Sequence, residues 1–174
     1  NGTGASSNVF TDSTSIAAAN RVAAQATCIQ NVYATGSGDQ SVVYGGITHN
    51  TWAQGINGNG NGIESNIVSN SSGNRSGTFT ATPKGIAATL ALGSIGTSTG
   101  GDGINGEMVI SSKGLSSQAF GIQSQRIAVS SFGDGPAGGI RAVLAAHSYG
   151  YGYQKNGIDG GPSPLEGSLI HGCV

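Results

Sequence analysis

The second half of the chain repeats one dipeptide at a fixed 18-residue interval. It occurs at Gly85-Ile86, Gly103-Ile104, Gly121-Ile122, Gly139-Ile140 and Gly157-Ile158. The segments that begin at these pairs also share a serine at the tenth position in the first four copies, at Ser94, Ser112, Ser130 and Ser148. A fixed period of this size is typical of stacked supersecondary units, each of which buries its apolar side against its neighbours. The spacing therefore predicts five β repeats over residues 85–174.

Two β geometries suit such a unit. One is a solenoid coil of short strands, which rises by about 4.8 Å per coil, the distance between hydrogen-bonded strands. The other is a strand-turn-strand hairpin per repeat, which builds a β-prism. In both geometries the isoleucines of the dipeptide form an internal ladder, made of Ile86, Ile104, Ile122, Ile140 and Ile158. The aligned serines either form hydrogen bonds inside the stack or lie on an exposed corner.

The composition favours an ordered β-rich rod. Glycine accounts for 32 of the 174 residues, and charged residues account for only 9%. Disordered chains usually carry a high net charge and few β-branched residues, whereas this chain has a formal charge of −1 and regularly placed Ile and Val. Because there is no basic stripe, we expect no nucleic-acid partner. Because no apolar run reaches about 18 residues, we expect no membrane insertion.

The N-terminal part, residues 1–33, carries a helix signal. Asp12, Ser13 and Thr14 are capping candidates before an alanine-rich run. That run has the three-four spacing of a helical stripe, at Ile16, Ala19, Ala23 and Ala26. We therefore expect a linker and a short α-helix here. Residues 34–84, which are rich in Asn-Gly turn signals, predict an irregular β-rich loop region before the repeats.

Three stretches resemble known fibrous proteins. The first, VFTDSTSIAAANRVAAQA, is similar to a short module repeated in bacteriophage tail-fibre proteins. The others, ATGSGDQSVVYGG and SSQAFGIQSQRIAVSS, resemble the head repeats of trimeric autotransporter adhesins and of many phage fibres. In those families each turn of a β-solenoid packs against two partner chains around a threefold axis. The resemblance implies a homotrimer located in a virion, or on the extracellular cell surface if the chain is an adhesin.

The predicted fold class is all-β: an elongated trimeric β-solenoid or triple-stranded β-helix or β-prism with 18-residue repeats, preceded by a short N-terminal α-helix. A single rod of this kind would have a small core, because many of its apolar positions are alanine. Association of three chains would supply the missing burial, and closed symmetric assembly is the usual solution.

Residues suited to catalysis or metal binding are dispersed along the chain. Asp102 and Glu107 are the closest regular pair of carboxylates, and a trimer could bring two carboxylates together as a glycosidase pair across a groove between subunits. His49, His147 and His171 lack the close spacing of metal ligands. We therefore predict no catalytic residue, no metal and no cofactor. Cys28 and Cys173 are expected to be free, with a bond between subunits as the alternative.

The strongest binding signal is the sequence SYGYGYQKN. Alternation with glycine would place Tyr149, Tyr151 and Tyr153 on one face of a strand, where aromatic rings can stack against sugar rings. Lys155 and Asn156 could add polar contacts, and Trp52 is a further aromatic candidate. The alternative is that these rings close the end of the solenoid or seal subunit contacts.

The function predicted from the sequence is a phage or prophage tail-fibre segment, a structural stalk or tip without catalytic activity that contacts host surface glycan. Its expected partners are copies of itself and a host cell-surface polysaccharide or outer-membrane receptor. Two alternatives remain: a phage-borne polysaccharide depolymerase fragment and the head of a bacterial trimeric adhesin.

Overall fold

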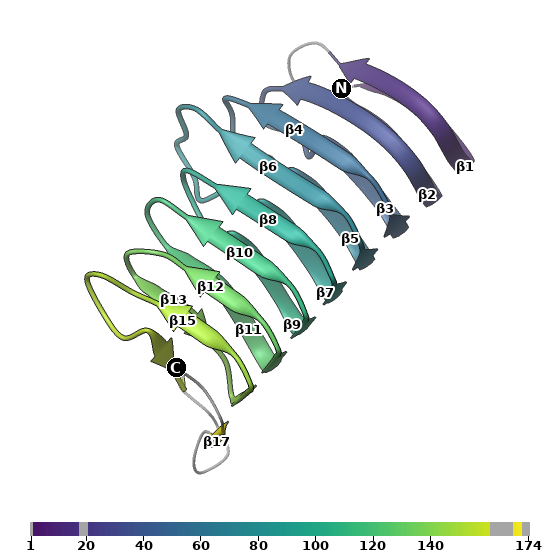
Figure 1. The fold of residues 1–174 in the computed structure, drawn as a ribbon. Helices are drawn as coiled ribbons and strands as arrows, with labels where there is room; N and C mark the ends of the chain where they lie inside the picture. Colours follow the sequence, from purple (N-terminus) through teal and green to yellow (C-terminus); the bar gives the residue numbers. More distant parts are fainter. Residues whose placement is uncertain (1, 18–20, 161–168, 172–174) are drawn as a thin grey trace.

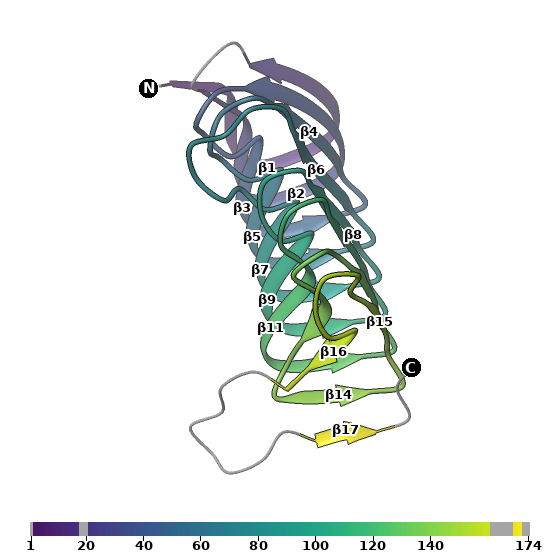
Figure 2. The same cartoon turned by 90° about the vertical axis from the view of Figure 1, so that its left-hand side faces the viewer.

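The protein is an all-β parallel solenoid of about eight turns (Figure 1). The structure, a computed structural model, describes residues 2–17, 21–160 and 169–171. Because each coil rises by about 4.8 Å, eight coils give a rod about 38 Å long. The described chain runs from one end of this rod to the other (Figure 2).

All strand pairs between neighbouring coils are parallel. In chain order the strands are β1 (Gly2–Ala17), β2 (Arg21–Ser37), β3 (Val43–His49), β4 (Trp52–Ile56), β5 (Ile63–Ser69), β6 (Ser72–Ser76), β7 (Ile86–Leu92), β8 (Ile95–Ser98), β9 (Ile104–Ile110), β10 (Lys113–Ser116), β11 (Phe120–Val129), β12 (Phe132–Asp134), β13 (Gly138–Arg141), β14 (Leu144–Ala146), β15 (Tyr149–Tyr151), β16 (Ile158–Asp159) and β17 (Leu169–His171).

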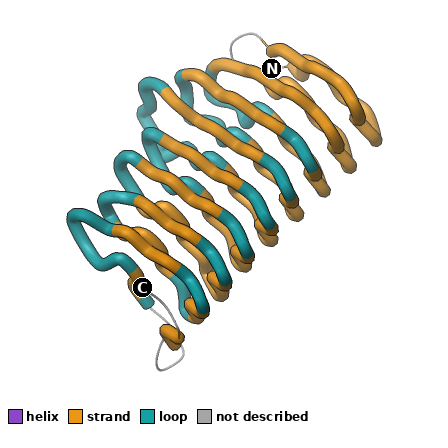
Figure 3. The backbone as a smooth tube through the Cα atoms, in the orientation of Figure 1, coloured by secondary structure: helices purple, strands orange, loops and turns teal. Residues whose placement is uncertain are grey.

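These strands form two faces of the rod, and loops form the third side (Figure 3). Face A consists of β3, β5, β7, β9 and β11, followed by β13 and β14, which pair with the first and the last part of β11. Beyond them, β16 pairs with β13 and β17 pairs with β14. Face B consists of β4, β6, β8, β10, β12 and β15. The long strand β2 contributes to both faces because its first half pairs with β3 and its second half with β4.

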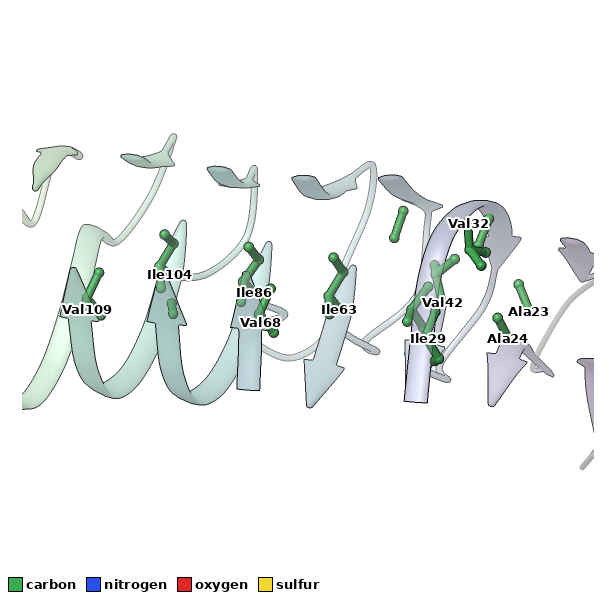
Figure 4. Packing of buried hydrophobic residues seen from close by; sticks show 14 of the residues in the cluster. Ala23, Ala24, Ile29, Val32, Val42, Ile63, Val68, Ile86, Ile104 and Val109 are labelled. Carbon is green, nitrogen blue, oxygen red and sulfur yellow. The ribbon is translucent and has the colours of Figure 1, made fainter. Parts of the chain in front are cut away.

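The isoleucines of the repeated dipeptide lie in one inward row of face A. Successive members are Cα partners, and the row continues toward the N-terminus through Ile63 and Val43. Every member from Val43 to Ile140 is fully buried, and Ile158 at the C-terminal end is half-buried. Figure 4 shows Ile63, Ile86 and Ile104 at equivalent places on successive coils.

A row of glycines on face B lets the two faces approach each other. Gly73, Gly96, Gly114, Gly133 and Gly150 are Cα partners along this row. A Cβ on Gly114 would lie 2.7 Å from Cγ1 of Ile122 and would also overlap the carbonyl oxygen of Gly121. The isoleucine side chains therefore fill the space that side chains on this glycine row would need.

Buried hydroxyls link the coils where face A turns into face B. The backbone N–H of Ser94 donates to Oγ of Ser112 at 3.1 Å, that of Ser112 to Oγ of Ser131 at 3.3 Å, and that of Ser131 to Oγ of Ser148 at 3.2 Å. Thr51 and Ser71 continue the row at its N-terminal end. Each of these hydroxyls also donates to the carbonyl two residues before it, so every buried hydroxyl of the row is satisfied.

The member of this hydroxyl row in the seventh coil is Ser131, whereas Ser130, the serine that the 18-residue interval aligns, lies at the exposed corner. The register of β11 shifts between Ser124 and Ile127, which adds one residue to this coil. As a result Ile122 pairs with Ile104 at the interval of the dipeptide, whereas Ile127 pairs with Met108, one residue further away in the sequence. The bulge turns Ser130 to the exposed corner and Ser131 to the interior.

The described residues at the N-terminus form strands where a helix was expected. Ala23, Ala24 and Ala26 are buried in β2, which pairs with β1 on one side and β3 on the other. Ile16, which the helical stripe would bury, is 75% exposed. Pairing with the next coil satisfies the backbone of these small residues and overrides their helical preference. Ala19 lies outside the described residues.

Residues 34–84 belong to the same stack of coils. Val43 pairs with Ile63, and Ile63 pairs with Ile86. In both pairs the two partners are further apart in the sequence than the inward partners after Ile86. Those later partners are separated by the constant 18-residue interval of the dipeptide. The loops of the third side between β4 and β7 hold the extra residues, as the Asn-Gly signals of this region indicated.

Candidate functional site

A sharp corner joins face A to face B in each of eight coils. The residues at this corner have φ angles between 45° and 56°, and they are Asp12, Asn31, Asn50, Asn70, Gly93, Ser111, Ser130 and His147. Asn and Asp adopt this left-handed conformation more readily than most residues. Nδ2 of Asn50 donates to Oδ1 of Asn31 at 2.6 Å, and Nδ2 of Asn31 donates to Oδ1 of Asp12 at 2.7 Å. The corner is therefore a polar edge, interrupted at Gly93, whose first three side chains are joined by hydrogen bonds.

A groove runs beside this polar edge along the rod; we call it the corner groove. Two adjoining hollows of about 660 and 480 Å³ form it, and both are lined by Gly93 and Ile95. The corner residues from Asn31 to His147 line one side, and the row of buried hydroxyls lines the floor. The other side is an outward row of face B in which successive residues are Cα partners: Tyr33, Trp52, Ser72, Ile95, Lys113, Phe132 and Tyr149.

Aromatic rings are stacked at the N-terminal end of the corner groove. The ring centroids of Tyr33 and Trp52 lie 4.2 Å apart with an angle of 5° between the ring planes. Tyr33 remains 46% exposed although it is stacked. The stack holds both rings in one orientation on successive coils and covers the two faces that meet, so the pair presents its ring edges and outer faces beside the polar edge.

A second stack lies at the C-terminal end. Phe132 and Tyr149 have ring centroids 5.3 Å apart and planes 7° apart, and Tyr149 is 43% exposed. Nζ of Lys113 lies 5.3 Å from the centroid of the Phe132 ring, within the range of a cation–π contact. The groove therefore has an aromatic pair near each end and a cation beside one of them.

The corner groove includes two of the six predicted glycan-binding residues, Trp52 and Tyr149. Tyr151 lies two residues further along β15, and its ring centroid is 6.3 Å from that of Tyr153. Tyr151 and Tyr153 are 52% and 57% exposed but do not line the groove. The exposed residues Lys155 and Asn156 lie in the loop after β15, also outside it.

The sequence reasoning missed Tyr33, Lys113 and Phe132. A usable signal was present, because Tyr33 and Trp52 each follow a corner asparagine by two residues. Phe132 and Tyr149 follow the corner residues Ser130 and His147 by the same interval. Only the register between coils shows that these residues form one row.

The structure separates the carboxylates that the sequence placed near each other. Asp102 is buried; its Oδ2 accepts from Nδ2 of Asn105 at 3.0 Å and its Oδ1 from the backbone N–H of Phe120 at 3.2 Å. Burial raises the pKa of Asp102, although these hydrogen bonds and the charges of Lys84 and Arg141 oppose the rise. Glu107 instead faces Arg126 at 3.8 Å on the surface.

A separate hollow of about 390 Å³, which we call the second hollow, lies at the N-terminal end of the third side. It is distinct from the two hollows that form the corner groove. Asp39 and Glu64 both line it, together with Tyr44. Oε2 of Glu64 accepts from Oγ of Ser41 at 2.6 Å, and Oδ1 of Asp39 accepts from the backbone N–H of Asn59 at 2.9 Å. Within the described ranges, no group of three or more His, Cys, Asp or Glu side chains is placed to hold a metal ion.

Arg75 is a buried cation on face B near this second hollow. It is fully buried; its Nε donates to the carbonyl oxygen of Gly58 at 3.2 Å, and its Nη2 donates to those of Asn57 and Gly38. Burial lowers the pKa of the guanidinium, and the charge of Asp39 opposes this. Its partners belong to the loops of successive coils, so Arg75 ties these loops to the interior.

Face A carries an outward apolar row along the rod, which we call the apolar row. Its members are Cα partners on successive coils: Val9, Cys28, Ile47, Ile67, Leu90, Met108, Ile127 and Leu144. Val9, Ile47 and Ile67 are exposed, and the others are half-buried. The described cysteine, Cys28, has a free thiol in this row, and Cys173 lies outside the described residues.

No family model, curated protein or solved structure matches this chain. Over the described part of the chain, no helix is long and apolar enough to cross a membrane.

Proposed function

We propose that the protein is a rigid, self-associating segment of a phage or prophage tail fibre whose corner groove binds a surface glycan of the host. The observation that carries the proposal is the combination, in one groove, of two stacked aromatic pairs with a row of polar corner residues. Sugar rings present apolar faces and peripheral hydroxyls, so a binding site for them needs aromatic surfaces beside hydrogen-bonding groups. A groove that runs along a rod suits an extended polymer.

The spacing of the aromatic pairs supports an oligomeric ligand. Trp52 and Tyr149 are separated by five coil steps, or about 24 Å along the rod. A single sugar cannot contact both pairs. Simultaneous contact with two weak sites raises the overall affinity well above that of either site. We therefore expect affinity to increase when the oligosaccharide becomes long enough to reach both.

The apolar row supports self-association. A row of eight apolar side chains on the surface is unusual for a monomeric protein and is typical of an interaction surface. A second copy of the chain repeats at the same interval between coils, so its own apolar row can match this one over the whole length. We propose the homotrimer that the sequence resemblance implies, with this row facing the partner chains.

Substitution of Tyr33 by Ala tests the glycan proposal. Tyr33 lines the corner groove and is 46% exposed, whereas Tyr153 is 57% exposed and lines neither the groove nor the Asp39 and Glu64 hollow, so Tyr153→Ala is the control. Loss of one stacking ring costs about 1 kcal/mol, and we expect Tyr33→Ala to weaken binding about five-fold and Tyr153→Ala to leave it unchanged. The measurement is titration calorimetry with oligosaccharides that bind in an array of bacterial surface glycans. Equal effects of the two substitutions would contradict the assignment of the corner groove.

The hollow that contains Asp39 and Glu64 favours a second candidate, a polysaccharide depolymerase. Glycosidases use two carboxyl groups, one as acid and the other as base or nucleophile. Incubation of the bound polysaccharide with the protein would release new reducing ends if this candidate is correct. Asp39→Asn and Glu64→Gln would each abolish the release, and the absence of any release by the unmodified protein rejects it.

A further inference from the structure

We infer that the ligand of the corner groove is an acidic polysaccharide, and that a carboxylate of this polysaccharide binds Lys113 between the two aromatic pairs. The inference rests on the proposed function, because it specifies the chemistry of a ligand for the same groove. It depends on the position of one cation, on the charges around it and on the distance between the aromatic pairs.

Lys113 lines the corner groove, and the pairing of β10 with β8 and β12 fixes its position in the outward row of face B. It is the Cα partner of Ile95 on one side and of Phe132 on the other. Its side chain is exposed, and Nζ lies 5.3 Å from the centre of the Phe132 ring. The Phe132 ring attracts the ammonium group and keeps it near the groove. Unlike a carboxylate, the ring accepts no ordinary hydrogen bond from the ammonium group. Lys113 can therefore donate to an anionic ligand without giving up an ion pair described in this structure.

No aspartate or glutamate is found among the described residues that line the corner groove. The residues opposite Lys113 across the groove are the corner hydroxyls of Ser111 and Ser130, with His147 one coil further on. Asp134 follows Phe132 by two residues and is the Cα partner of Leu115, so it lies diagonally to Lys113 and does not line the groove. An anionic ligand in the groove thus meets the Lys113 ammonium and the corner hydroxyls.

The groove differs in this respect from the second hollow of the molecule. Asp39 and Glu64 line that hollow, and both accept hydrogen bonds from neighbouring residues. An acidic polymer would be repelled there, although the formal charge of the whole chain is only −1. The distribution of charge, and not the net charge, therefore directs an acidic polymer to the corner groove.

The position of Lys113 along the rod places the charge inside the ligand. Lys113 is three coil steps from Trp52 and two from Tyr149, or about 14 and 10 Å. A chain that contacts both aromatic pairs must pass the ammonium group. A polysaccharide with an acidic group in its repeating unit brings a carboxylate to this point in whichever direction it binds.

The test compares acidic oligosaccharides with their uncharged esters. Oligogalacturonate and oligomannuronate, long enough to span both aromatic pairs, are titrated beside their fully methyl-esterified forms at low salt. We expect the free acids to bind about ten-fold more tightly, a difference of about 1.4 kcal/mol. Lys113→Gln should reduce the affinity for the acids to that for the esters and leave the esters unaffected, whereas Lys113→Arg should retain the preference. Added salt should weaken only the binding of the acids.

The outcomes separate this inference from the proposed function. If Tyr33→Ala weakens the binding of acids and esters alike while Lys113→Gln changes neither, the groove binds glycan but the acidic specificity is wrong. Preferential binding of the esters, or of neutral array glycans alone, also overturns the inference. If no glycan of the array or of this panel binds, both the inference and the proposed function fail.

Discussion

At the scale of single residues, Asp102 is the described carboxylate whose pKa the fold affects most. It is buried between Asn105 and the backbone N–H of Phe120, and its removal from water raises its pKa. The folded protein therefore binds a proton more strongly at this site than the unfolded chain does. Protonation of Asp102 favours the folded state, and ionisation disfavours it.

This linkage predicts a pH dependence of stability that Asp102→Asn removes. Between the ordinary pKa of an aspartate and the raised value, the folded state carries more protons, so the free energy of unfolding contributed by Asp102 falls as pH rises. We expect the free energy of unfolding of the unmodified protein to fall relative to that of Asp102→Asn as pH increases from about 4 to 7. Urea denaturation at each pH measures it.

Asp134→Asn is the control, because it also removes one carboxylate but from the outward side of β12. A difference between unmodified protein and Asp102→Asn that is constant with pH, or that grows in the opposite direction, would contradict the assigned rise in pKa.

At the scale of the strands, the bulge in β11 decides which serine lies inside. Ser131 is buried; its Oγ accepts from the backbone N–H of Ser112 and donates to the carbonyl oxygen of Val129 at 2.8 Å. Ser130, one residue earlier, is exposed at the corner with a φ of 49°. Adjacent residues of the same type thus have different roles in one coil.

Ser131→Ala and Ser130→Ala form a matched pair that tests this register. Ser131→Ala leaves the buried N–H of Ser112 without its acceptor, and an unsatisfied buried group costs about 1–3 kcal/mol. We expect Ser131→Ala to lower the free energy of unfolding by that amount and Ser130→Ala to change it by less than about 0.5 kcal/mol, as is usual for surface positions. Chemical denaturation followed by circular dichroism measures both. The reverse order of effects would place Ser130 inside.

The same strands show how far the sequence could predict the fold. The 18-residue interval predicted β repeats with an isoleucine row, because a strict period reports directly on which residues stack, and it left a solenoid and a β-prism as alternatives. It could not locate Ser131, because a bulge inserts a residue without a local signal. The sequence also predicted a helix where β2 lies, because alanines spaced for a helical stripe meet the burial needs of a narrow coil equally well.

The candidate site was less predictable than the fold. Tyr149 was identified within the SYGYGYQKN cluster and Trp52 as a separate aromatic candidate, but their position in one row depends on the unequal lengths of the coils between them. Alternation with glycine predicted all three tyrosines on one strand face; Tyr149 and Tyr151 lie there, but Tyr153 lies in the loop after β15. It could not show that the groove ends at Tyr149, because that limit is set by the corner residues of the neighbouring coils.

At the scale of the whole molecule, the corner groove and the apolar row lie on different outward surfaces, face B and face A. The groove's aromatic row is carried by strands such as β8 and β10, and the apolar row by β7 and β9. In the proposed assembly, partner chains would cover the apolar row, which lies three residues before the corner, as Leu90 does before Gly93, and the aromatic row of face B would face the ligand. A fibre built in this way would present one groove per chain along its length, and several weak contacts would act together.

A single charge in the apolar row tests the assembly. Leu90 in β7 and Thr97 in β8 lie in the same coil, and both are half-buried on outward surfaces of different faces. An unpaired lysine ammonium inside an apolar interface is strongly unfavourable, because its charge loses water without gaining a partner.

If the apolar row joins three chains, we expect the unmodified protein to have the mass of three chains by light scattering. Leu90→Lys should have the mass of one chain, and Thr97→Lys should remain trimeric. Unchanged circular dichroism would show that the coils stay folded. If the unmodified protein has the mass of one chain at all concentrations, or if Thr97→Lys dissociates as readily as Leu90→Lys, the apolar row is not the surface that holds the copies together.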